Sequence, residues 1–412
     1  MSDLYQKSKL AFEAAKTLSL QSSLQKNAAL IEMAKALKDS ETEILKANEQ
    51  DLLENPHLST ALKDRLLLTP KRLEAMASGL KEVADLEDPN GHEIYMTQRP
   101  NGLKIRKVRV PIGVIGIIYE ARPNVTSDAA ALCLKAGNAV ILRGGSEAFH
   151  SNQAIVKVLK AGLARSLISP DAIQIIEDTD RTVVAEMIKL REYLDLIIPR
   201  GGAGLIKFVT ENATVPVIET GVGNCHIYID KDADLEMAKE IIINGKCQRP
   251  GVCNALEKAL IHEDIAAEFL PLIAEELKSR GVLLKGCPYA RQFLPELEVA
   301  NQNDWSTEYL DLIMAIRVVE SLDDALMHIA KYSSKHSEAI VTNNYFTAKR
   351  FEAEVDAAAV YVNASTRFTD GAEFGLGAEI GISTQKLHAR GPMGLEELTT
   401  VKYVIEGEGQ IR

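Results

Sequence analysis

The sequence predicts an α/β protein built on a parallel sheet that helices cover on both faces. From residue 114 onward, short and continuously apolar runs alternate with helical patterns, and such runs are typical of strands buried on both faces. The 412 residues suffice for two or more domains, and 46% hydrophobic with 25% charged residues is a globular composition. Glycines directly follow two of the apolar runs, at the strand ends where parallel sheets bind ligands.

The elements can be assigned in order along the chain. Residues 3 to 87 place apolar side chains at spacings of three and four, which predicts helices. Alternation then begins, and Asn101-Gly102 between two alternating runs signals a β-hairpin over 93–111. Strands are predicted at 114–119, 139–142, 172–176, 194–198, 215–218, 226–229, 256–262, 313–319, 339–341, 360–362 and 399–405. Helices are predicted near 127–136, 150–167 and 233–246.

Composition and charge exclude several classes of function. A net charge of −11 argues against binding nucleic acid through a basic field, and no apolar run has the length of a membrane span. The five cysteines form no C-x-x-C pair, and the N-terminus lacks a signal-peptide pattern, so we expect a cytoplasmic protein with reduced thiols. The eight histidines show no metal-ligand spacing, and we expect no metal.

One cysteine lies where a nucleophile would be expected. Cys253 is in the segment Arg249-Pro250-Gly251-Val252-Cys253-Asn254, between a predicted helix and the strand 256–262. Small neighbours, hydrogen-bond donors and a nearby arginine suit a reactive thiolate. The alternative is a half-buried core cysteine, and the other cysteines, Cys247 included, lack this context.

Arginine and paired glycines follow two of the predicted strands. The run 139–142 leads into Arg143-Gly144-Gly145-Ser146, and the run 194–198 leads into Arg200-Gly201-Gly202-Ala203-Gly204. Glycines let the backbone approach phosphate oxygens, and arginine donates charge-assisted hydrogen bonds. The pattern favours a nucleotide with several phosphates over simple tight turns, although G-x-G-x-x-G is absent.

A further candidate is Glu219, which follows the run 215–218 and precedes Thr220-Gly221. A carboxylate there would lie at the mouth of the same sheet. An acidic residue before glycine is also a common turn residue, and the pattern favours neither role.

Several motifs resemble a known family. Glu219-Thr220-Gly221 with Cys253 34 residues later, and Pro123-Asn124 after the strand 114–119, resemble the aldehyde dehydrogenase superfamily. The blocks 119–126, 248–255 and 362–394 look like its γ-glutamyl phosphate reductase branch. The resemblance covers the chain from about residue 8. It implies an aldehyde-dehydrogenase-like α/β fold with a parallel-sheet cofactor domain, an α/β catalytic thiol domain and a small β oligomerisation element.

The resemblance also implies domain boundaries. The cofactor domain would comprise 1–92 and 112–222 with part of 366–398, and the thiol domain would comprise 223–365. The hairpin 93–111 and the segment 399–412 would form the oligomerisation element, since both alternate and have no other apparent sheet. We therefore expect a homo-oligomer.

The implied reaction is the reduction of L-glutamyl 5-phosphate by NADPH to L-glutamate 5-semialdehyde, phosphate and NADP+, in L-proline biosynthesis. Cys253 would expel phosphate and form a thioacyl enzyme. Asn124 and the backbone N–H of Cys253 would stabilise the oxyanion. Glu219 matches the glutamate that activates water in hydrolysing relatives, but a reductase must keep water from its thioester. Glu219 would therefore assist proton movement, orient the nicotinamide, or be retained for structural reasons alone.

By the same resemblance, Arg143 and Ser146 would lie at the adenosine ribose, where arginine favours NADPH over NADH. Glu308 resembles the glutamate that binds the nicotinamide ribose, although Asp311 and Leu312 replace the glycine-proline pair of the family. The residues that map near the pyrophosphate are Arg200, Gly201, Gly202 and Gly204.

The substrate carries a phosphate, a carboxylate and an ammonium group, so it requires cationic donors and one acid. Arg122, Arg249 and Arg367 are the candidates for the two anionic groups, because arginine suits bidentate recognition. Arg249 is nearest to the thiol in sequence and is assigned to the phosphate. Glu120 is assigned to the ammonium.

Three functions remain open from the sequence. The first is the acyl phosphate reductase, and the second is an oxidative or coenzyme A-acylating semialdehyde dehydrogenase of the same superfamily. Phosphate dependence of the reverse reaction would separate these two. The third is a catalytically silent scaffold in contact with the glutamate 5-kinase that makes the substrate, against which the intact Cys253 and Asn124 count.

Overall fold

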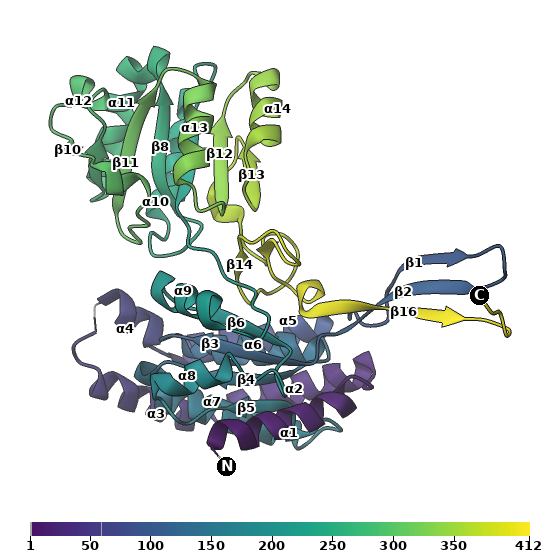
Figure 1. Ribbon diagram of the computed structural model, residues 1–412. Coiled ribbons are helices and arrows are strands. Elements are labelled where there is room, and N and C mark those ends of the chain that lie inside the picture. Colours follow the sequence, from purple (N-terminus) through teal and green to yellow (C-terminus); the bar gives the residue numbers. More distant parts are fainter. Residues whose placement is uncertain (1, 59) are drawn as a thin grey trace. The chain divides into compact units, whose positions relative to one another are not determined.

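A computed structural model describes residues 2–58 and 60–412 of the chain (Figure 1). The chain forms two compact units. The first runs to Thr220 and takes in Gly375–Gly381 and Met393–Arg412. The second comprises Gly221–Phe374 and Ile382–Pro392. Each unit has its own sheet and core, so each is described separately below.

The predicted N-terminal helices are present, and side-chain caps define their starts. Ser2 accepts the N–H of Tyr5 at the start of the first helix, and Ser22 and Gln25 form a capping box at the second. Thr69 caps the fifth, which has Pro70 in its first turn. The helices are α1 (Asp3–Leu18), α2 (Ser23–Asp39), α3 (Glu41–Glu54), α4 (Thr60–Leu66) and α5 (Pro70–Asp85).

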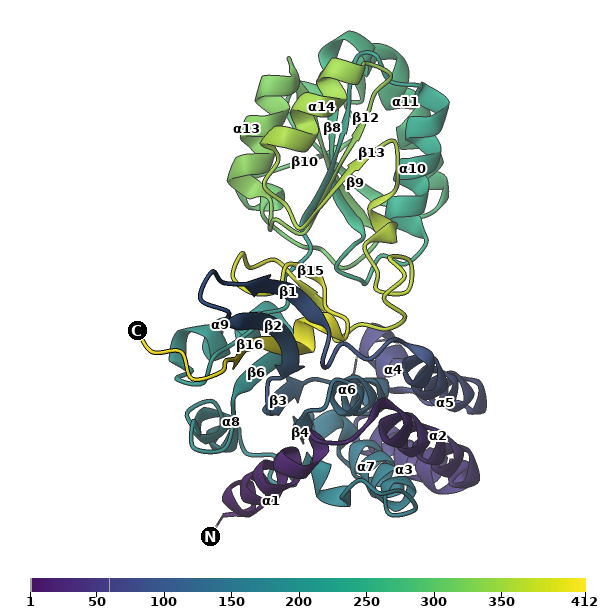
Figure 2. The same cartoon turned by 90° about the vertical axis from the view of Figure 1, so that its right-hand side faces the viewer.

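A four-stranded parallel sheet forms the centre of the first unit, in the order β5-β4-β3-β6. Helices α1, α8 and α9 pack on one face, while α2, α3 and α5 to α7 lie on the other (Figure 2). The strands are β3 (Val114–Tyr119), β4 (Ala139–Arg143), β5 (Ile173–Ile175) and β6 (Leu196–Arg200). The helices are α6 (Pro123–Lys135), α7 (Phe149–Leu163), α8 (Arg181–Met187) and α9 (Ala203–Asn212).

The strand predicted at 215–218 is wrong. The segment makes only an isolated bridge between Val217 and Ile197, with the carbonyl of Pro216 accepting from the N–H of Ile197 at 2.8 Å. Pro216 has no N–H to donate to a neighbouring strand, so a continuous ladder cannot form there. The apolar side chains Val215 and Ile218 are nevertheless buried, which explains why the run resembled a strand.

The second unit is built on a seven-stranded parallel sheet, in the order β10-β9-β11-β8-β7-β12-β13. Helices α10 and α11 pack on one face, and α13 and α14 on the other (Figure 2). The strands are β7 (Cys225–Ile229), β8 (Leu256–His262), β9 (Leu283–Gly286), β10 (Glu298–Val299), β11 (Ile313–Val319), β12 (Ser337–Val341) and β13 (Ala359–Val362). The helices are α10 (Leu235–Cys247), α11 (Glu263–Ser279), α12 (Ala290–Phe293), α13 (Leu322–Tyr332) and α14 (Tyr345–Glu354).

A third sheet is antiparallel and belongs to the first unit, from which it projects (Figure 1). The predicted hairpin pairs β1 (Glu93–Gln98) with β2 (Lys104–Pro111), and β16 (Thr399–Glu406) pairs with the other edge of β2. Gly102 has φ +90 in the connecting loop, a conformation that glycine adopts without steric cost. The alternating segments therefore form a sheet of their own.

The remaining elements are short. They are β14 (Ile382–Ser383), β15 (Gly391–Pro392), and the 3-10 turns at Ser146–Ala148, Pro170–Ala172, Gln302–Trp305, Thr366–Phe368 and Glu396–Leu398. Within residues 2–58 and 60–412, every helix is too short or too polar to cross a membrane.

We expect Gly162→Ala to lower the free energy of unfolding by about 1–3 kcal/mol, because the new methyl group overpacks a helix contact. A Cβ at Gly162 of α7 would lie 2.7 Å from the Cα of Met33 on α2. Gly79→Ala, in helix α5, is the matched control, since a Cβ there meets no atom within 4 Å and should raise stability by about 0.5–1 kcal/mol. Urea unfolding of both variants measures the difference, and equal effects would contradict the packing argument.

Candidate active site

The Cys253 loop joins α10 to β8 in the second unit, as predicted. Cys253 is half-buried, and its carbonyl accepts a hydrogen bond from the thiol of buried Cys225 at 3.2 Å. The neighbouring Asn254 donates to the carbonyls of Arg367 and Thr369, at 3.3 and 2.9 Å. The loop is thus fixed on two sides while the thiol of Cys253 keeps partial exposure, which a nucleophile requires.

Two of the predicted substrate arginines flank this loop. Exposed Arg249 is on the loop itself, and the Nε of half-buried Arg367 donates to the side chain of Gln248 at 3.0 Å. Burial lowers the pKa of Arg367, and the positive charge of Arg249 lowers it further. The two guanidinium groups therefore share one electrostatic environment, and that environment includes Cys253.

Glu308 lies in the loop before β11, where its carboxylate accepts the N–H of Gly223 at 2.7 Å. Gly223 in turn packs directly on the cysteine loop, because a Cβ at this position would lie 1.6 Å from the carbonyl oxygen of Cys253. Only glycine fits here. Glu308 is accordingly connected to the nucleophile loop through one backbone segment.

Asn124 is exposed in the first turn of α6, in the first unit. Its Nδ2 donates to the carboxylate of Asp128, one turn later, at 3.1 Å. Burial raises the pKa of Asp128 to about 6, against the opposing effects of hydrogen bonds from Asn124 and Ser127 and of the charge of Arg200. The amide of Asn124 is thus oriented by an acidic neighbour and keeps a second N–H.

The glycines after β6 are held by an acidic side chain. The N–H of Gly202 donates to the carboxylate of Glu120 at 3.0 Å, and a Cβ at Gly201 would lie 2.7 Å from the same carboxyl group. Gly202 is the N-cap of α9, and a Cβ at Gly204 meets no atom within 4 Å. Glu120 therefore lies at the predicted pyrophosphate loop in this structure, and its assignment to the substrate ammonium stays a prediction.

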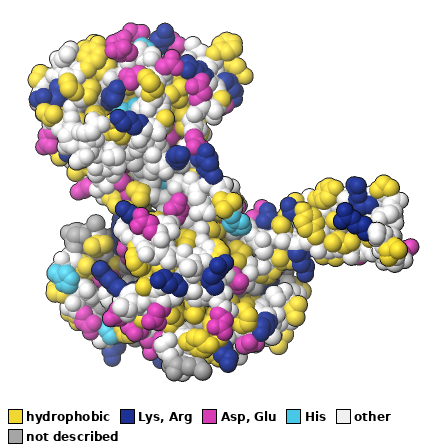
Figure 3. Space-filling model, viewed as in Figure 1, with side chains coloured by type: hydrophobic (Ala, Val, Ile, Leu, Met, Phe, Trp, Pro, Cys, Tyr) yellow, Lys and Arg dark blue, Asp and Glu magenta, His cyan; other side chains and the backbone are white. Residues whose placement is uncertain are grey.

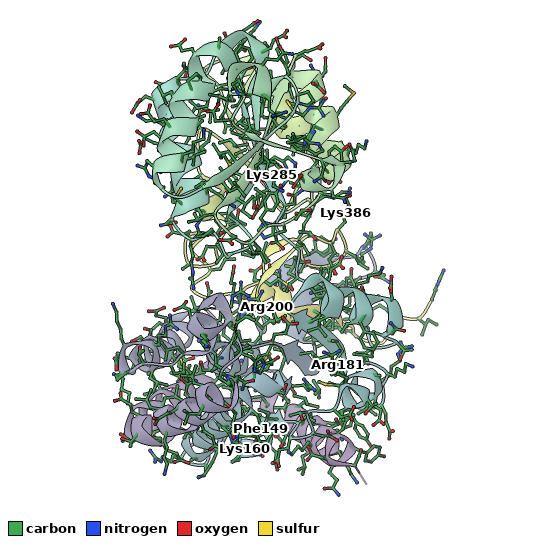
Figure 4. All side chains as sticks on the ribbon, turned by 90° about the vertical axis from the view of Figure 1, so that its left-hand side faces the viewer. Phe149, Lys160, Arg181, Arg200, Lys285 and Lys386 are labelled. Atoms are coloured by element: carbon green, nitrogen blue, oxygen red, sulfur yellow. The ribbon has the colours of Figure 1, made fainter. Side chains whose placement is uncertain are left out.

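Arg200 ends β6 and lies beside the segment that contains Gly381 (Figure 4). A Cβ at Gly381 would come within 2.4 Å of the guanidinium of Arg200. The same guanidinium contributes positive charge to the surroundings of Asp128. Arg200 thus connects the glycine strand end with the start of α6.

Arg143 and Ser146 lie after β4 but differ in exposure. The guanidinium of Arg143 is buried and donates to the carbonyls of Gly144, Thr179 and Asp180, at 3.0, 2.5 and 3.3 Å. Ser146 is exposed. The guanidinium of Arg143 is therefore committed to backbone carbonyls at the end of β4, while Ser146 is accessible to solvent.

The two remaining predicted residues are both half-buried in the first unit. Arg122 is the N-cap residue of α6, next to Asn124 in sequence. Glu219 follows buried Ile218 and precedes Thr220, whose hydroxyl donates to the carbonyl of Pro199 at 2.9 Å. Arg122 therefore lies at the start of a helix, whereas Glu219 lies in a segment outside any helix or strand.

Asp128 and Gly223 were missed from the sequence. The four-residue spacing of Asn124 and Asp128 on one helix was a usable signal, because such pairs face each other. Gly223 carried no comparable signal, since its contact is with a residue 30 positions away. Among residues 2–58 and 60–412, the structure has no cluster of three side chains suited to hold a metal ion.

Comparison with known proteins identifies the family to which the chain belongs. The model of the aldehyde dehydrogenase family matches residues 2–283, and the chain belongs to this family. Membership of this family implies a nicotinamide cofactor.

The resemblance to the γ-glutamyl phosphate reductase branch is confirmed. A relative of that name from Moorella thermoacetica is 62% identical over 408 residues, which is 98% of both chains. Another from Clostridium beijerinckii is 58% identical, with complete coverage of both. The crystal structure of the γ-glutamyl phosphate reductase from Thermotoga maritima has a TM-score of 0.97 and 54% identity, and covers 100% of each chain.

We expect Asp128→Asn to change how stability depends on pH. The raised pKa, about 6 against an ordinary value of 3.8, means that between these pH values the folded chain holds a proton that the unfolded chain has lost. The contribution of Asp128 to the free energy of unfolding is therefore largest at low pH, and it falls as the pH rises from about 4 to about 6. The variant side chain cannot ionise. The difference in unfolding temperature, variant minus wild type, should therefore be larger above pH 6 than at pH 4.

Thermal unfolding of both proteins at pH 4 to 8 provides the measurement. Ser127→Ala is the control, because it removes the neighbouring hydroxyl that contacts Asp128 at 3.4 Å but leaves the carboxyl group. Parallel curves for wild type and Asp128→Asn would show that the carboxyl group titrates normally.

Proposed function

We propose that the chain catalyses the NADPH-dependent reduction of L-glutamyl 5-phosphate to L-glutamate 5-semialdehyde and phosphate, a step of L-proline biosynthesis. The observation that carries the proposal is the half-buried thiol of Cys253 on a loop with Arg249, in an environment shared with Arg367. A thiol that expels phosphate needs cations around both the thiolate and the leaving group. The name of the relatives, γ-glutamyl phosphate reductase, supports the same reaction.

Cys253 acts as the nucleophile. Its thiolate attacks the acyl carbon, the bond to the phosphate oxygen breaks, and phosphate leaves with the electron pair, so that a thioester remains on the enzyme. NADPH, when bound, supplies a hydride to the thioester carbon. The carbon–sulfur bond then breaks, which releases the semialdehyde and restores the thiolate. Arg249 is assigned to the phosphate because it is exposed on the same loop.

Asn124 and the backbone N–H of Cys253 are assigned to the oxyanion. The second Nδ2 hydrogen of Asn124 is available for this role, because the hydrogen bond to Asp128 uses only one. Preorganised donors of this kind stabilise charge that develops in the transition state. Glu219 is assigned to proton movement or to the orientation of the nicotinamide, and Arg122 and Arg367 to the anionic groups of the substrate.

The preference for NADPH over NADH rests on the end of β4. Arg143 adds positive charge there, and exposed Ser146 offers a hydroxyl donor where a carboxylate would repel a 2′-phosphate. The pyrophosphate is assigned to Arg200, Gly201, Gly202 and Gly204, with Glu120 displaced from the N–H of Gly202. Glu308 is assigned to the nicotinamide ribose.

We expect wild-type protein to reduce NADP+ with L-glutamate 5-semialdehyde only when inorganic phosphate is present. Cys253→Ala should lower this rate by about a thousandfold or more, because the covalent intermediate cannot form. Cys247→Ala is the matched control, since Cys247 is also half-buried but has no assigned role. Absorbance of NADPH reports the rate.

Each alternative has its own signature in this assay. Turnover without phosphate would indicate an oxidative dehydrogenase, and turnover that requires coenzyme A would indicate an acylating one. An absence of turnover in wild-type protein under all three conditions would favour the silent scaffold.

We further propose that the three-stranded sheet joins copies of this chain. The register places Tyr95, Lys107 and Tyr403 opposite one another, and Thr97, Ile105 and Ile405 likewise, so these residues share one face. Tyr95 is 52% exposed, and Tyr403 and Ile405 are each 59% exposed. Hydrophobic and basic side chains line the projecting strands (Figure 3), and an exposed apolar sheet face of this kind is typical of subunit contacts.

We expect Tyr403→Glu to weaken the oligomer, because it places a charge in the apolar face. Lys402→Glu is the matched control: it adds a glutamate at the adjacent position, whose side chain points to the opposite face of β16. Sedimentation at several concentrations should show dissociation only for Tyr403→Glu. A wild-type monomer, or equal behaviour of the two variants, would refute the assignment of this face.

A further inference from the structure

Three charged side chains are buried where the cysteine loop begins and ends. Lys246 lies in the last turn of α10, and Glu257 and Lys258 lie at the start of β8. The segment between Lys246 and Glu257 carries Cys253. All three side chains are inaccessible to solvent. Such residues are almost never fully buried unless they are paired, so their contacts require an explanation.

Lys246 and Glu257 connect the two ends of the loop. The ammonium of Lys246 lies 3.3 Å from the carboxylate of Glu257. Burial raises the pKa of Glu257 to about 7 and lowers the pKa of Lys246. An apolar pair of the same volume would avoid this desolvation cost, so the buried pair is weak evidence for added stability. Removal of one partner alone would leave the other charge buried without compensation.

Glu257 also fixes a second loop. Its carboxylate accepts the N–H groups of Tyr309 and Leu310, at 3.2 and 3.3 Å. Leu310 has φ +55, a conformation that non-glycine residues adopt at a cost and that the surroundings must maintain. The backbone is held at the residues that directly follow Glu308.

Lys258 holds the other side of the same loop. Its ammonium donates to the carbonyl of Thr307 at 2.8 Å and lies 4.3 Å from the centre of the Tyr309 ring. Glu308 is therefore flanked by contacts to Lys258 on one side and to Glu257 on the other. All of these contacts are made to the three residues Thr307, Tyr309 and Leu310, which directly surround Glu308 in sequence.

The contacts of Glu257, Glu308, Gly223 and Cys253 connect the two loops in a closed chain of interactions. From Glu257 they pass to the loop that carries Glu308, from Glu308 to the N–H of Gly223 at 2.7 Å, and from Gly223 to the carbonyl of Cys253. From Cys253 the chain returns to Glu257 within four residues. The nucleophile loop and the Glu308 loop thus depend on one buried carboxylate.

We propose that Lys246, Glu257 and Lys258 are positioning residues that fix Cys253 and Glu308 relative to each other. The inference rests on the proposed function for the roles of Cys253 and Glu308 as nucleophile and ribose ligand. It extends that function, because none of the three buried residues touches a reacting atom.

The test compares variants that remove one charge each. Glu257→Gln keeps the size and one acceptor oxygen, and Lys246→Met replaces lysine by an unbranched apolar side chain that is one heavy atom shorter. The matched control is Lys26→Met in the first unit, which removes the ammonium of another buried ion pair, Lys26 with Asp88. All proteins are full-length.

Two rates should move in opposite directions. A loosened loop exposes the half-buried thiol, so alkylation of Cys253 by iodoacetamide, followed by peptide mass spectrometry, should become severalfold faster in Glu257→Gln and Lys246→Met. A misplaced nucleophile reacts more slowly, so kcat for the semialdehyde should fall about 100-fold. Lys26→Met should leave both rates close to those of wild type.

Buried Cys287, in the second unit, reports global opening. The proposal is wrong if the alkylation rate of Cys287 rises in parallel with that of Cys253. It is also wrong if Glu257→Gln folds and its Cys253 reacts with iodoacetamide at the wild-type rate. If Glu257→Gln does not fold, the double variant Lys246→Met, Glu257→Leu removes both charges together, and the same two rates decide. The alkylation measurement needs no substrate, so it gives an answer even if the proposed reaction fails in wild-type protein.

Discussion

Parallel strands impose the constraint on which the rest of this structure depends. Each parallel connection must cross back over the sheet through a helix, so all strand ends of one kind collect at one edge. In the first unit this edge gathers the glycines after β6, Ser146 after β4 and the start of α6 with Asn124. In the second unit the same geometry brings distant segments onto the cysteine loop. The candidate side chains lie in loops or at the first turn of a helix, next to a sheet that holds these segments in place.

Within the second unit, polar contacts to backbone atoms do most of this holding. Asn254 binds two carbonyls of the segment after β13, and Glu308 binds the N–H of Gly223. Side chains that bind main-chain atoms fix a loop without fixing the identity of the residues that they hold. The thiol of Cys253 can therefore stay partly exposed while its backbone is closely surrounded.

The sequence predicted the elements well where one physical signal dominated. The strands 256–262 and 313–319 have the predicted bounds. The strand prediction for 215–218 was wrong because an apolar run can be buried without pairing with a neighbouring strand. Pro216 permits the burial of this segment but prevents a continuous ladder of hydrogen bonds. The Cys253 loop was selected because its residue types suggest chemistry, and the family resemblance added Asn124. The catalytic roles of both remain predictions.

Other parts of the site could not be predicted, because they depend on contacts distant in sequence. Lys246, Glu257 and Lys258 have the composition of a solvated surface, and only the packing of seven strands buries them. The engagement of Arg143 with three carbonyls is likewise a property of the folded loop. Sequence identifies which groups are available, whereas the fold decides which of them are already committed to the backbone.

The pairing of β16 with β2 means that the three-stranded sheet can be completed only after β16 has been synthesised. Thr399–Glu406 completes a sheet whose other strands begin at Glu93, so the last strand is synthesised long after its partners. Until then, one edge of β2 offers unpaired N–H and C=O groups to any passing strand. The apolar face described above is therefore complete only on a chain that has been translated to its final strand. If copies of the chain assemble through this face, as proposed, only chains that include Thr399–Glu406 present the whole contact surface.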